Sequence, residues 1–297
     1  MARAKRDEPP FDTVAIVGVG LIGGSLGMAA HKKGLATKVI GVGRSEPKLM
    51  RAKILGAVDE YSLDLEHGAR EADLVIICTP VRTIVPTLRK MVMHLKDGAV
   101  VTDVGSTKRE IVRDASAIVP AARYFVGGHP MAGLEQAGVE RAKADLFENA
   151  TYVITNAEDT DLGALGKLTE FAEGLGARVE VMSPEEHDAA VAVISHLPHA
   201  MSAALLHLAA DTQRRTGKTF RLAAGSFRDL TRISDSPPEL WSDICATNSD
   251  YIVQTIMGLR EILDTLASAL KAEDDSLVQG FFEEAREIKE AYQRIAR

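Results

Sequence analysis

The stretch Val14-Ala15-Ile16-Val17-Gly18-Val19-Gly20-Leu21-Ile22-Gly23-Gly24-Ser25 decides the fold of this chain. Four apolar residues precede a Gly-x-Gly-x-x-Gly turn, and an alanine-rich run then continues to Lys33. This order predicts a buried strand, a tight glycine turn and the first turns of a helix. A second predicted strand, from Lys38 to Val42, completes a strand–helix–strand unit.

The glycine turn has the chemistry of a dinucleotide phosphate site. Gly18 allows the turn, Gly20 leaves room for a pyrophosphate beside the backbone, and Gly23 lets the helix pack closely on the strand. Free N–H groups and the positive end of the helix dipole attract phosphates. We therefore predict that the turn binds a dinucleotide through Gly18, Gly20, Leu21, Ile22 and Gly23. The alternative is a glycine-rich turn that binds nothing.

The residues after the second predicted strand bear on which dinucleotide binds. An NAD-binding unit carries an acidic residue about 20 positions beyond the glycines, where it holds the adenosine ribose. Gly43 stands at that position, and Arg44 and Ser45, which suit a 2′-phosphate, follow it. We predict NADP as the favoured cofactor, and NAD stays open because Glu46 is close enough to replace the missing acid.

The composition predicts a globular protein with no nucleic-acid or membrane partner. The 297 residues are 46% hydrophobic and 26% charged, and the formal net charge is −7. Such a chain has little non-specific attraction to nucleic acid or anionic lipid, and no apolar run approaches the length of a bilayer span. Residues 1–10 lack the apolar core of a signal peptide and are expected to be a disordered leader. Cys78 and Cys245 have no metal-type neighbours, so we expect free thiols in a reducing cytoplasm.

Strands and helices alternate as far as residue 182. Strands are expected at residues 74–78, 99–102, 124–126, 152–155 and 178–181, and helices at 84–93, 108–117 and 162–175. This alternation predicts an α/β fold with a doubly wound, mostly parallel sheet of the Rossmann type. We assign residues 1–182 to a dinucleotide-binding domain.

The pattern becomes helical at Ser183-Pro184-Glu185-Glu186. Serine suits the N-cap, proline suits the first helical position, and Glu186 completes a capping box. No convincing strand follows, and apolar residues repeat every three or four positions from Leu240 to Ile295. We predict that residues 183–297 form an all-helical substrate and dimerisation domain. Its long apolar helices are expected in a homodimer interface, with a bundle inside one chain as the alternative.

Four predicted strand ends should meet at one crevice, because ligands bind beyond the carboxyl ends of the strands in such a sheet. They are Gly18 to Gly23, Thr79-Pro80-Val81, Asp103 to Lys108, and Gly127 to Gly133. Within this crevice we assign Thr79 and Pro80 to the cofactor.

His129 is the candidate catalytic residue of the crevice. It leaves its strand in a glycine-flanked loop before a proline, so its ring can project towards a ligand. A neutral imidazole there can take a proton as a substrate hydroxyl is oxidised; a structural histidine bonded to loop carbonyls is the alternative. Ser106 can hydrogen-bond His129, the nicotinamide or the substrate, and it can also cap the following helix.

The helical half supplies candidate substrate-binding residues. His196 and His199 share a helix face, and Pro198 between them should kink the helix and open a polar pocket. His199 is expected to bind an anionic group there, unless it bonds a carbonyl that the proline frees. Arg232 offers a fork for a carboxylate, with a surface salt bridge as the alternative. No carboxylate or cysteine stands at ligand spacing from these histidines, so no metal site is predicted.

Five motifs follow one another along nearly the whole chain. They are the glycine turn from Val17 to Ser25, Asp103-Val104-Gly105-Ser106-Thr107-Lys108, Gly128-His129-Pro130-Met131-Ala132-Gly133-Leu134-Glu135, Ser195-His196-Leu197-Pro198-His199-Ala200 and Phe227-Arg228-Asp229-Leu230-Thr231-Arg232-Ile233. Together they resemble the prephenate/arogenate (cyclohexadienyl) dehydrogenase family of tyrosine biosynthesis. The resemblance implies oxidative decarboxylation of prephenate to 4-hydroxyphenylpyruvate, or of arogenate to tyrosine, with hydride transfer to NAD(P). The chain departs from the family at Gly43, where NAD-using members carry an acid.

The resemblance also implies roles for individual residues. His129 takes the catalytic hydrogen bond to the substrate hydroxyl, and Ser106 supports it. Arg232 and His199 match residues that contact substrate carboxylates. His187 and Glu135 match a polar pair at the site entrance, and Trp241 matches an aromatic residue near the pocket. The helical domain would be the dimer interface.

Two other functions stay open at this point. One is a β-hydroxy-acid dehydrogenase of similar two-domain build, which normally places a catalytic lysine in its helical domain. Lys218 is the only lysine between His187 and Lys271, and it lies in a polar loop. The other is a dinucleotide-sensing regulator without turnover.

Overall fold

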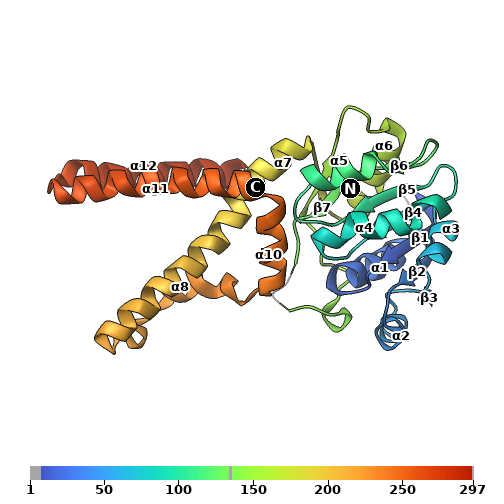
Figure 1. The fold of residues 1–297 in the computed structure, drawn as a ribbon, viewed down its shortest axis with the longest axis horizontal. Coiled ribbons are helices and arrows are strands. Elements are labelled where there is room, and N and C mark those ends of the chain that lie inside the picture. Colours follow the sequence, from blue (N-terminus) through green and yellow to red (C-terminus); the bar gives the residue numbers. More distant parts are fainter. Residues whose placement is uncertain (1–7, 134–135, 296–297) are drawn as a thin grey trace. The chain divides into compact units, whose positions relative to one another are not determined.

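The computed structural model describes residues 8–133 and 136–295, and the chain divides into two compact parts, Met1–Ser249 and Asp250–Arg297 (Figure 1). The strands are β1 (Phe11–Val17), β2 (Ala36–Val42), β3 (Glu60–Ser62), β4 (Leu74–Ile77), β5 (Val100–Asp103), β6 (Tyr124–Phe125), β7 (Gly128–Pro130), β8 (Thr151–Thr155) and β9 (Arg178–Met182). The helices are α1 (Leu21–Lys33), α2 (Glu46–Ile54), α3 (Leu65–Glu71), α4 (Val81–Met91), α5 (Arg109–Ser116), α6 (Leu162–Gly174), α7 (Pro184–Val191), α8 (Leu197–Thr216), α9 (Gly225–Thr231), α10 (Pro238–Thr247), α11 (Ser249–Lys271) and α12 (Asp275–Ile295). Residues 1–7 of the expected leader lie outside the described residues, and the first strand begins directly after residue 10.

The main sheet is parallel, with the strand order β3-β2-β1-β4-β5-β6. Both of its faces are covered, because alternate residues of β1 enter two different cores. Val14 and Ile16 pack with residues of α1 and α6, whereas Ala15 and Val17 pack with residues of α3, α4 and α5. The doubly wound α/β fold expected from the sequence is confirmed.

A second, three-stranded sheet takes the later strands out of the main one. Its order is β7-β8-β9, with β7 and β8 antiparallel and β8 and β9 parallel. The chain passes from β6 to β7 through two glycines that allow close packing. A Cβ on Gly128 would lie 2.8 Å from the carbonyl oxygen of Asp103. This passage positions His129 on β7, opposite Val153 of β8, beside the end of β5.

The helical half begins as the sequence predicts. Ser183 and Glu186 form the capping box, with hydrogen bonds in both directions, at the start of α7. A π-helical segment, Ala192–His196, then joins α7 to α8 just before Pro198. The irregularity expected at this proline is therefore present on its N-terminal side, as a wider helical turn.

The continuous helical run Pro184–Thr216 is long and apolar enough, by length and composition, to cross a membrane. Its most apolar 18-residue window has a mean hydropathy of 1.5, and 22% of that window is buried. The sequence alone predicts no apolar run of the length of a bilayer span. The run from Ala189 to Ala210 nevertheless contains no Asp, Glu, Lys or Arg. The helix therefore presents an apolar surface that α7–α10 leave partly uncovered.

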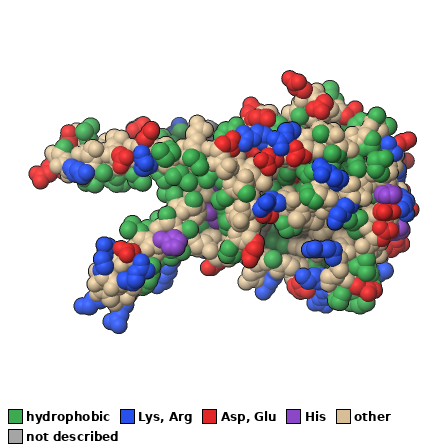
Figure 2. All heavy atoms as spheres, viewed as in Figure 1, with side chains coloured by type: hydrophobic (Ala, Val, Ile, Leu, Met, Phe, Trp, Pro, Cys, Tyr) green, Lys and Arg blue, Asp and Glu red, His purple; other side chains and the backbone are tan. Residues whose placement is uncertain are grey.

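The second part of the chain, considered by itself, is built from α11 and α12. Hydrophobic side chains are exposed along both helices, and Figure 2 shows them as green atoms among the charged ones. They include Val253, Ile256, Met257, Ile262, Leu263, Leu270, Leu277, Phe282, Ile288 and Tyr292. A pair of helices cannot cover this much apolar surface, and surfaces of this kind mark interaction sites.

Candidate active site

The glycine turn between β1 and α1 has the shape that a pyrophosphate requires. Gly18 has φ +94°, and a Cβ there would lie 2.7 Å from the carbonyl oxygen of Cys78. At Gly23 a Cβ would lie 2.4 Å from the carbonyl oxygen of Gly18, so helix and strand touch. A Cβ on Gly20 would meet nothing within 4 Å, which leaves open space at the start of α1. A phosphate can therefore reach the free N–H groups of the first helical turn.

Leu21 and Ile22 open α1, and their side chains pack inward. Leu21 is buried, and Ile22 packs against the core on one face of the main sheet. Only their backbone N–H groups therefore remain to face a ligand at the helix start.

Thr79 and Pro80 follow β4 at the same edge of the sheet. A Cβ on Gly18 would lie 3.3 Å from the Thr79 methyl group, so the two strand ends are neighbours. The Thr79 hydroxyl is buried and has no hydrogen-bond partner within residues 8–133 and 136–295. Because buried polar groups are normally paired, this hydroxyl is available to a bound ligand.

The segment after β2 carries no acid at the expected ribose position. The N–H of Gly43 donates to the Ser62 carbonyl at 3.2 Å, and Arg44 beside it is exposed. Ser45 precedes α2 and makes no side-chain cap bond there. A Cβ on Gly43 would lie 3.4 Å from Leu49, an ordinary contact, so a larger side chain has room. The Arg44 guanidinium and the Ser45 hydroxyl therefore lie next to the expected ribose position.

A buried ion pair fixes the peptide in front of His129. Lys108 and Asp103 are wholly buried and paired with each other. The Asp103 carboxylate accepts the N–H of Gly128 at 3.2 Å, and Lys108 Nζ donates to the Gly128 carbonyl at 2.9 Å. Burial lowers the pKa of Lys108, and the Asp103 charge opposes that shift. The backbone N–H and the carbonyl of Gly128 are thus both hydrogen-bonded, which fixes the orientation of the peptide at the start of β7.

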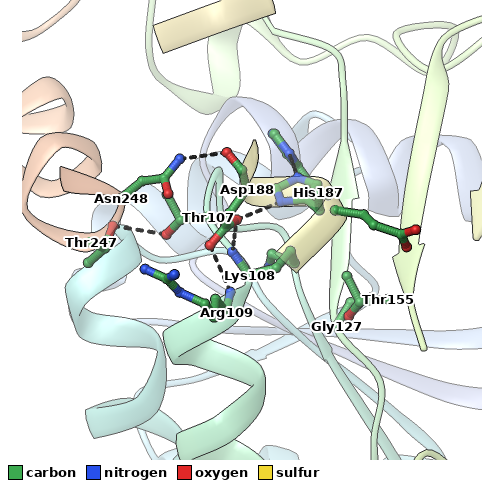
Figure 3. Close-up of polar contacts among 12 residues, drawn as sticks. Thr107, Lys108, Arg109, Gly127, Thr155, His187, Asp188, Thr247 and Asn248 are labelled. Carbon is green, nitrogen blue, oxygen red and sulfur yellow. Dashed lines mark hydrogen bonds and ion pairs between the residues drawn. The ribbon is translucent and has the colours of Figure 1, made fainter. Parts of the chain in front are cut away.

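His129 belongs to a chain of three side chains. Its Nδ1 lies 2.8 Å from Nε2 of His187, and Nδ1 of His187 lies 2.7 Å from Oδ1 of Asp188. The Asp188 carboxylate also accepts the backbone N–H groups of Lys108 at 2.7 Å and of Arg109 at 2.9 Å (Figure 3). His187 and Asp188 are wholly buried, whereas His129 is half-buried. His187, which the resemblance placed at the site entrance, therefore lies behind His129.

The surroundings of His129 keep its imidazole neutral. Burial lowers its pKa well below the ordinary 6.5, and His187, Lys108 and His196 lower it further. A neutral imidazole has a lone pair, so it can accept a proton or a hydrogen bond from a substrate hydroxyl.

Ser106 lies half-buried in the turn between β5 and α5. It does not cap α5, because Lys108 is the N-cap residue and the Asp188 carboxylate binds the first N–H groups instead. Among the described residues, the ring nitrogen contact of His129 is with His187 and not with Ser106. The Ser106 hydroxyl therefore does not hold the His129 ring in place.

His199 lies on α8 beside the aromatic ring of Trp241. The two rings stack with their centroids 3.9 Å apart, and Nδ1 of His199 lies 2.9 Å from the Ser195 carbonyl oxygen. The bond to a carbonyl was the alternative interpretation of this histidine. It leaves Nε2 as the ring nitrogen that can contact a substrate.

Two buried polar atoms near these rings are unpaired. Trp241 Nε1, a donor, and Asn248 Oδ1, an acceptor, are buried without a hydrogen-bond partner in the part of the chain that the structure describes. The Asn248 amide nitrogen contacts His196 Nδ1 at 3.2 Å and donates to the Asp188 carbonyl at 2.8 Å (Figure 3). Burial is the main cause that lowers the pKa of His196 to about 4. Trp241 and Asn248 therefore have a donor and an acceptor, respectively, that protein atoms leave unpaired in the described part of the chain.

Arg232 begins a short helical turn, Arg232–Asp235, and its side chain is exposed. The turn is attached to α8, because the hydroxyls of Ser234 and Ser202 lie 2.6 Å apart. Ser202 follows His199 by three positions, so Arg232 belongs to a segment that packs on the same helix. Glu135 lies outside the described residues.

Sequence reasoning missed Asp188, Lys108 and Asn248. Asp188 could have been found from its position, because it directly follows His187 in the first turns of a helix whose start is fixed by a capping box. Lys108 closes the Asp103 motif, yet nothing in the motif shows that its charge is buried. Asn248 becomes relevant only through a long-range contact.

Comparison with known proteins identifies the family of both halves of the chain. The family model described as prephenate dehydrogenase, nucleotide-binding domain, matches residues 26–181, and the model of the dimerization domain matches residues 183–284. The prephenate dehydrogenase of Bacillus subtilis is 37% identical over 94% of this chain and 76% of its own length. The cyclohexadienyl dehydrogenase of Zymomonas mobilis is 31% identical over 94% of this chain and 95% of its own length.

Solved structures agree with these sequence matches. The prephenate dehydrogenase from Aquifex aeolicus, in complex with hydroxyphenyl propionate and NAD+, is similar at a TM-score of 0.87 and 33% identity, covering 95% of this chain and 98% of its own. Synechocystis arogenate dehydrogenase is similar at 0.84 and 34% identity, covering 94% and 99%. A 3-hydroxyisobutyrate dehydrogenase from Mycobacterium tuberculosis, at 14% identity and a TM-score of 0.58 over 82% of this chain and 87% of its own, shares the fold alone. The chain belongs to the prephenate dehydrogenase family.

Proposed function

We propose that this chain catalyses the oxidative decarboxylation of prephenate to 4-hydroxyphenylpyruvate in tyrosine biosynthesis, with arogenate as a second candidate substrate that would yield tyrosine. The observation that carries the proposal is the placement of His129. Its neutral ring lies at the carboxyl edge of the sheet that also holds the glycine turn, and a buried partner fixes it. The relatives and solved structures named above support the same reaction.

In the proposed reaction His129 accepts a hydrogen bond from the hydroxyl on the substrate ring carbon. As that carbon loses its hydride, the hydroxyl becomes acidic, and the imidazole stabilises the developing positive charge. The ring carboxylate leaves as CO2, and its bonding electrons complete the aromatic ring. The oxygen keeps its proton in the phenol product, so the histidine ends as it began. A nicotinamide bound at the glycine turn would accept the hydride.

We assign the remaining residues to substrate and cofactor by the same argument. Ser106 supports His129, and Arg232 and His199 bind substrate carboxylates. Trp241 lines the pocket, while His187 and Glu135 stay assigned to its polar surroundings. The glycine turn, Thr79 and Pro80 bind the dinucleotide.

We propose NADP as the favoured cofactor and NAD as the alternative. Gly43 presents no acid to a ribose, whereas Arg44 and Ser45 offer a cation and a hydroxyl to a 2′-phosphate. The Aquifex aeolicus relative is described with NAD+, so both cofactors belong in the test.

We also propose that residues 1–182 bind the dinucleotide, and that residues 183–297 bind substrate and form a homodimer. The dimerization-domain match and the exposed apolar side chains of α11 and α12 support the second assignment. The two free thiols, Cys78 and Cys245, suit a cytoplasmic protein.

A steady-state assay tests the proposed function. The protein is incubated with prephenate or arogenate and with NADP or NAD, and reduced nicotinamide is followed by its absorbance. Turnover of at least one pair, with release of CO2, is expected. Binding of a dinucleotide without turnover of either substrate would instead favour a regulator.

A further inference from the structure

We propose that Asp188 and His187 are positioning residues that hold His129 in a single tautomer, with its proton on Nδ1 and a bare Nε2 towards the substrate. The kinetic part of the test rests on the function proposed above. The structural part concerns only the proton positions in the folded protein.

The direction of both hydrogen bonds among His129, His187 and Asp188 follows from the carboxylate of Asp188. An ionised carboxylate can only accept, so the 2.7 Å contact between Asp188 Oδ1 and His187 Nδ1 places the proton on Nδ1 of His187. Nε2 of His187 then carries a lone pair, and at 2.8 Å it accepts from Nδ1 of His129. Nε2 of His129 is left without a proton, which is the state that a hydrogen-bond acceptor requires.

The Asp188 carboxylate is surrounded by hydrogen-bond donors. It accepts the backbone N–H groups of Lys108 at 2.7 Å and Arg109 at 2.9 Å, in addition to the imidazole of His187. All three contacts are with N–H groups, and the carboxylate lies at the N-terminal end of α5, so Asp188 acts as an acceptor in each of them. Asn248 holds the backbone of the same residue, because its amide donates to the Asp188 carbonyl at 2.8 Å.

His187 has no room to adopt another role. Its side chain is wholly buried, and both ring nitrogens are within hydrogen-bond distance of named partners. The rings of His129 and His187 meet edge to face, with centroids 5.1 Å apart, which suits an in-plane hydrogen bond between their nitrogens.

The charges around His129 come from three elements. Lys108, paired with Asp103, approaches from the start of α5, His187 with Asp188 from α7, and His196 from the π-helical segment. The arrangement has the logic of a catalytic base oriented by a third group, with a second imidazole inserted between base and carboxylate.

The first test reads the proton positions by NMR of the full-length chain labelled with 15N-histidine. The ring nitrogen shifts distinguish the two neutral tautomers, and the resonances are assigned with His129→Asn and His187→Gln. The wild type should show His129 protonated on Nδ1. In Asp188→Asn an amide NH2 can donate to Nδ1 of His187, so the proton of His187 moves to Nε2 and is donated to Nδ1 of His129. His129 should then show a substantial population protonated on Nε2.

The second test compares prephenate kinetics of matched variants. Asp188→Asn should lower kcat by about 10- to 100-fold, part of the 10²–10⁴ that a positioned base supplies, with KM for prephenate changed less than kcat. Glu185→Gln removes an exposed carboxylate from the same helix and should match the wild type in kcat and in NMR. If Asp188→Asn does not fold, His187→Gln and His187→Leu decide. The glutamine oxygen can still accept from His129, so His187→Gln should retain more activity than His187→Leu.

The proposal is overturned if wild-type His129 carries its proton on Nε2, or if Asp188→Asn keeps the wild-type ring shifts and kcat. It is likewise overturned if His187→Gln and His187→Leu are equally active. Failure of the proposed function looks different. In that case His129→Asn would turn over prephenate normally, or the wild type not at all, while the ring shifts still report the tautomer.

Discussion

At the scale of single residues, the function depends on one imidazole held in a defined state. His129 is half-buried, lies next to a buried histidine and a buried lysine, and has a lowered pKa. Each of these conditions keeps its lone pair available at neutral pH. The sequence identified this histidine from its glycine-flanked loop and the proline after it, but not the side chains behind it. Those contacts join residues 58 positions apart, which local pattern cannot show.

His129→Asn should separate catalysis from cofactor binding. Asparagine keeps a polar group near the site, but its amide is a far weaker base than imidazole and stabilises the developing positive charge less, so kcat should fall by about 10²- to 10⁴-fold. The glycine turn is untouched, so the dissociation constant of the dinucleotide, measured by the fluorescence of its reduced form, should stay within about 3-fold, less than 1 kcal/mol. Near-normal turnover would remove His129 from the catalytic role.

The pH dependence of kcat/KM follows from the same imidazole. Because the pKa of His129 is lowered from 6.5, its neutral form persists to a lower pH than that of an ordinary histidine. Activity should therefore rise with pH through the acidic range, with a midpoint below 6.5, and level off at neutral pH. The measurement is kcat/KM for prephenate across this range, with folding checked at each pH. An acid limb centred above 6.5 would contradict the environment described for the ring.

Gly43→Asp should change the cofactor preference. The new Cβ makes an ordinary contact with Leu49 at 3.4 Å, so the carboxylate can be built without displacing α2. An acid there repels a 2′-phosphate and accepts hydrogen bonds from a ribose, so the ratio of kcat/KM for NADP to that for NAD should fall at least about 10-fold. Gly43→Asn is the control of equal size, and it should shift the ratio less. A wild-type preference for NAD would refute the argument from Arg44.

At the scale of helices and strands, the sequence predicts regular elements well and their partners less well. The strand–turn–helix around Gly18, the buried β4 and the capping box at Ser183 follow from local chemistry, and the structure contains all three. The separate sheet β7-β8-β9 does not follow, because the segments that form β8 and β9 flank a helix just as strands of the main sheet do. What separates them is the close passage at Gly128, a contact between distant segments.

Two alanine substitutions should show that Gly23 is needed for packing and Gly20 for dinucleotide binding. Gly23→Ala places a methyl group 2.4 Å from the Gly18 carbonyl, so α1 must shift, and the free energy of unfolding should fall by about 1–3 kcal/mol. Gly20→Ala meets nothing within 4 Å in the free protein, so its melting temperature should match the wild type. Its dinucleotide affinity should nevertheless fall at least about 10-fold, because the methyl group occupies the space intended for the pyrophosphate. Equal effects of both changes on stability would contradict this division.

At the scale of the whole molecule, α11 and α12 leave a large apolar surface exposed. Leu277 and Ile288, for example, are each 62% exposed on these helices. Exposed apolar surfaces of this kind are typical of sites where another protein binds. The apolar period of three or four in the sequence predicted these helices and their interface. It could not show which side chains would remain uncovered within one chain. The match to a family dimerization domain supports a second copy as the partner.

Ile288→Lys should weaken that proposed homodimer, and Glu287→Lys is its matched control. The two positions are adjacent, both are exposed on α12, and both variants introduce the same side chain. Successive residues differ by about 100° around a helix, so residue 288 lies in the apolar stripe with Leu277 and Phe281, whereas residue 287 lies outside it. Burying an unpaired ammonium in an apolar interface should raise the dimer dissociation constant at least about 10-fold, which sedimentation velocity over a dilution series would measure. Because Glu287→Lys adds its charge on the polar side, it should dissociate at the wild-type concentration. If both variants dissociate alike, general charge and not the apolar stripe controls assembly, and if neither does, the dimer uses another surface.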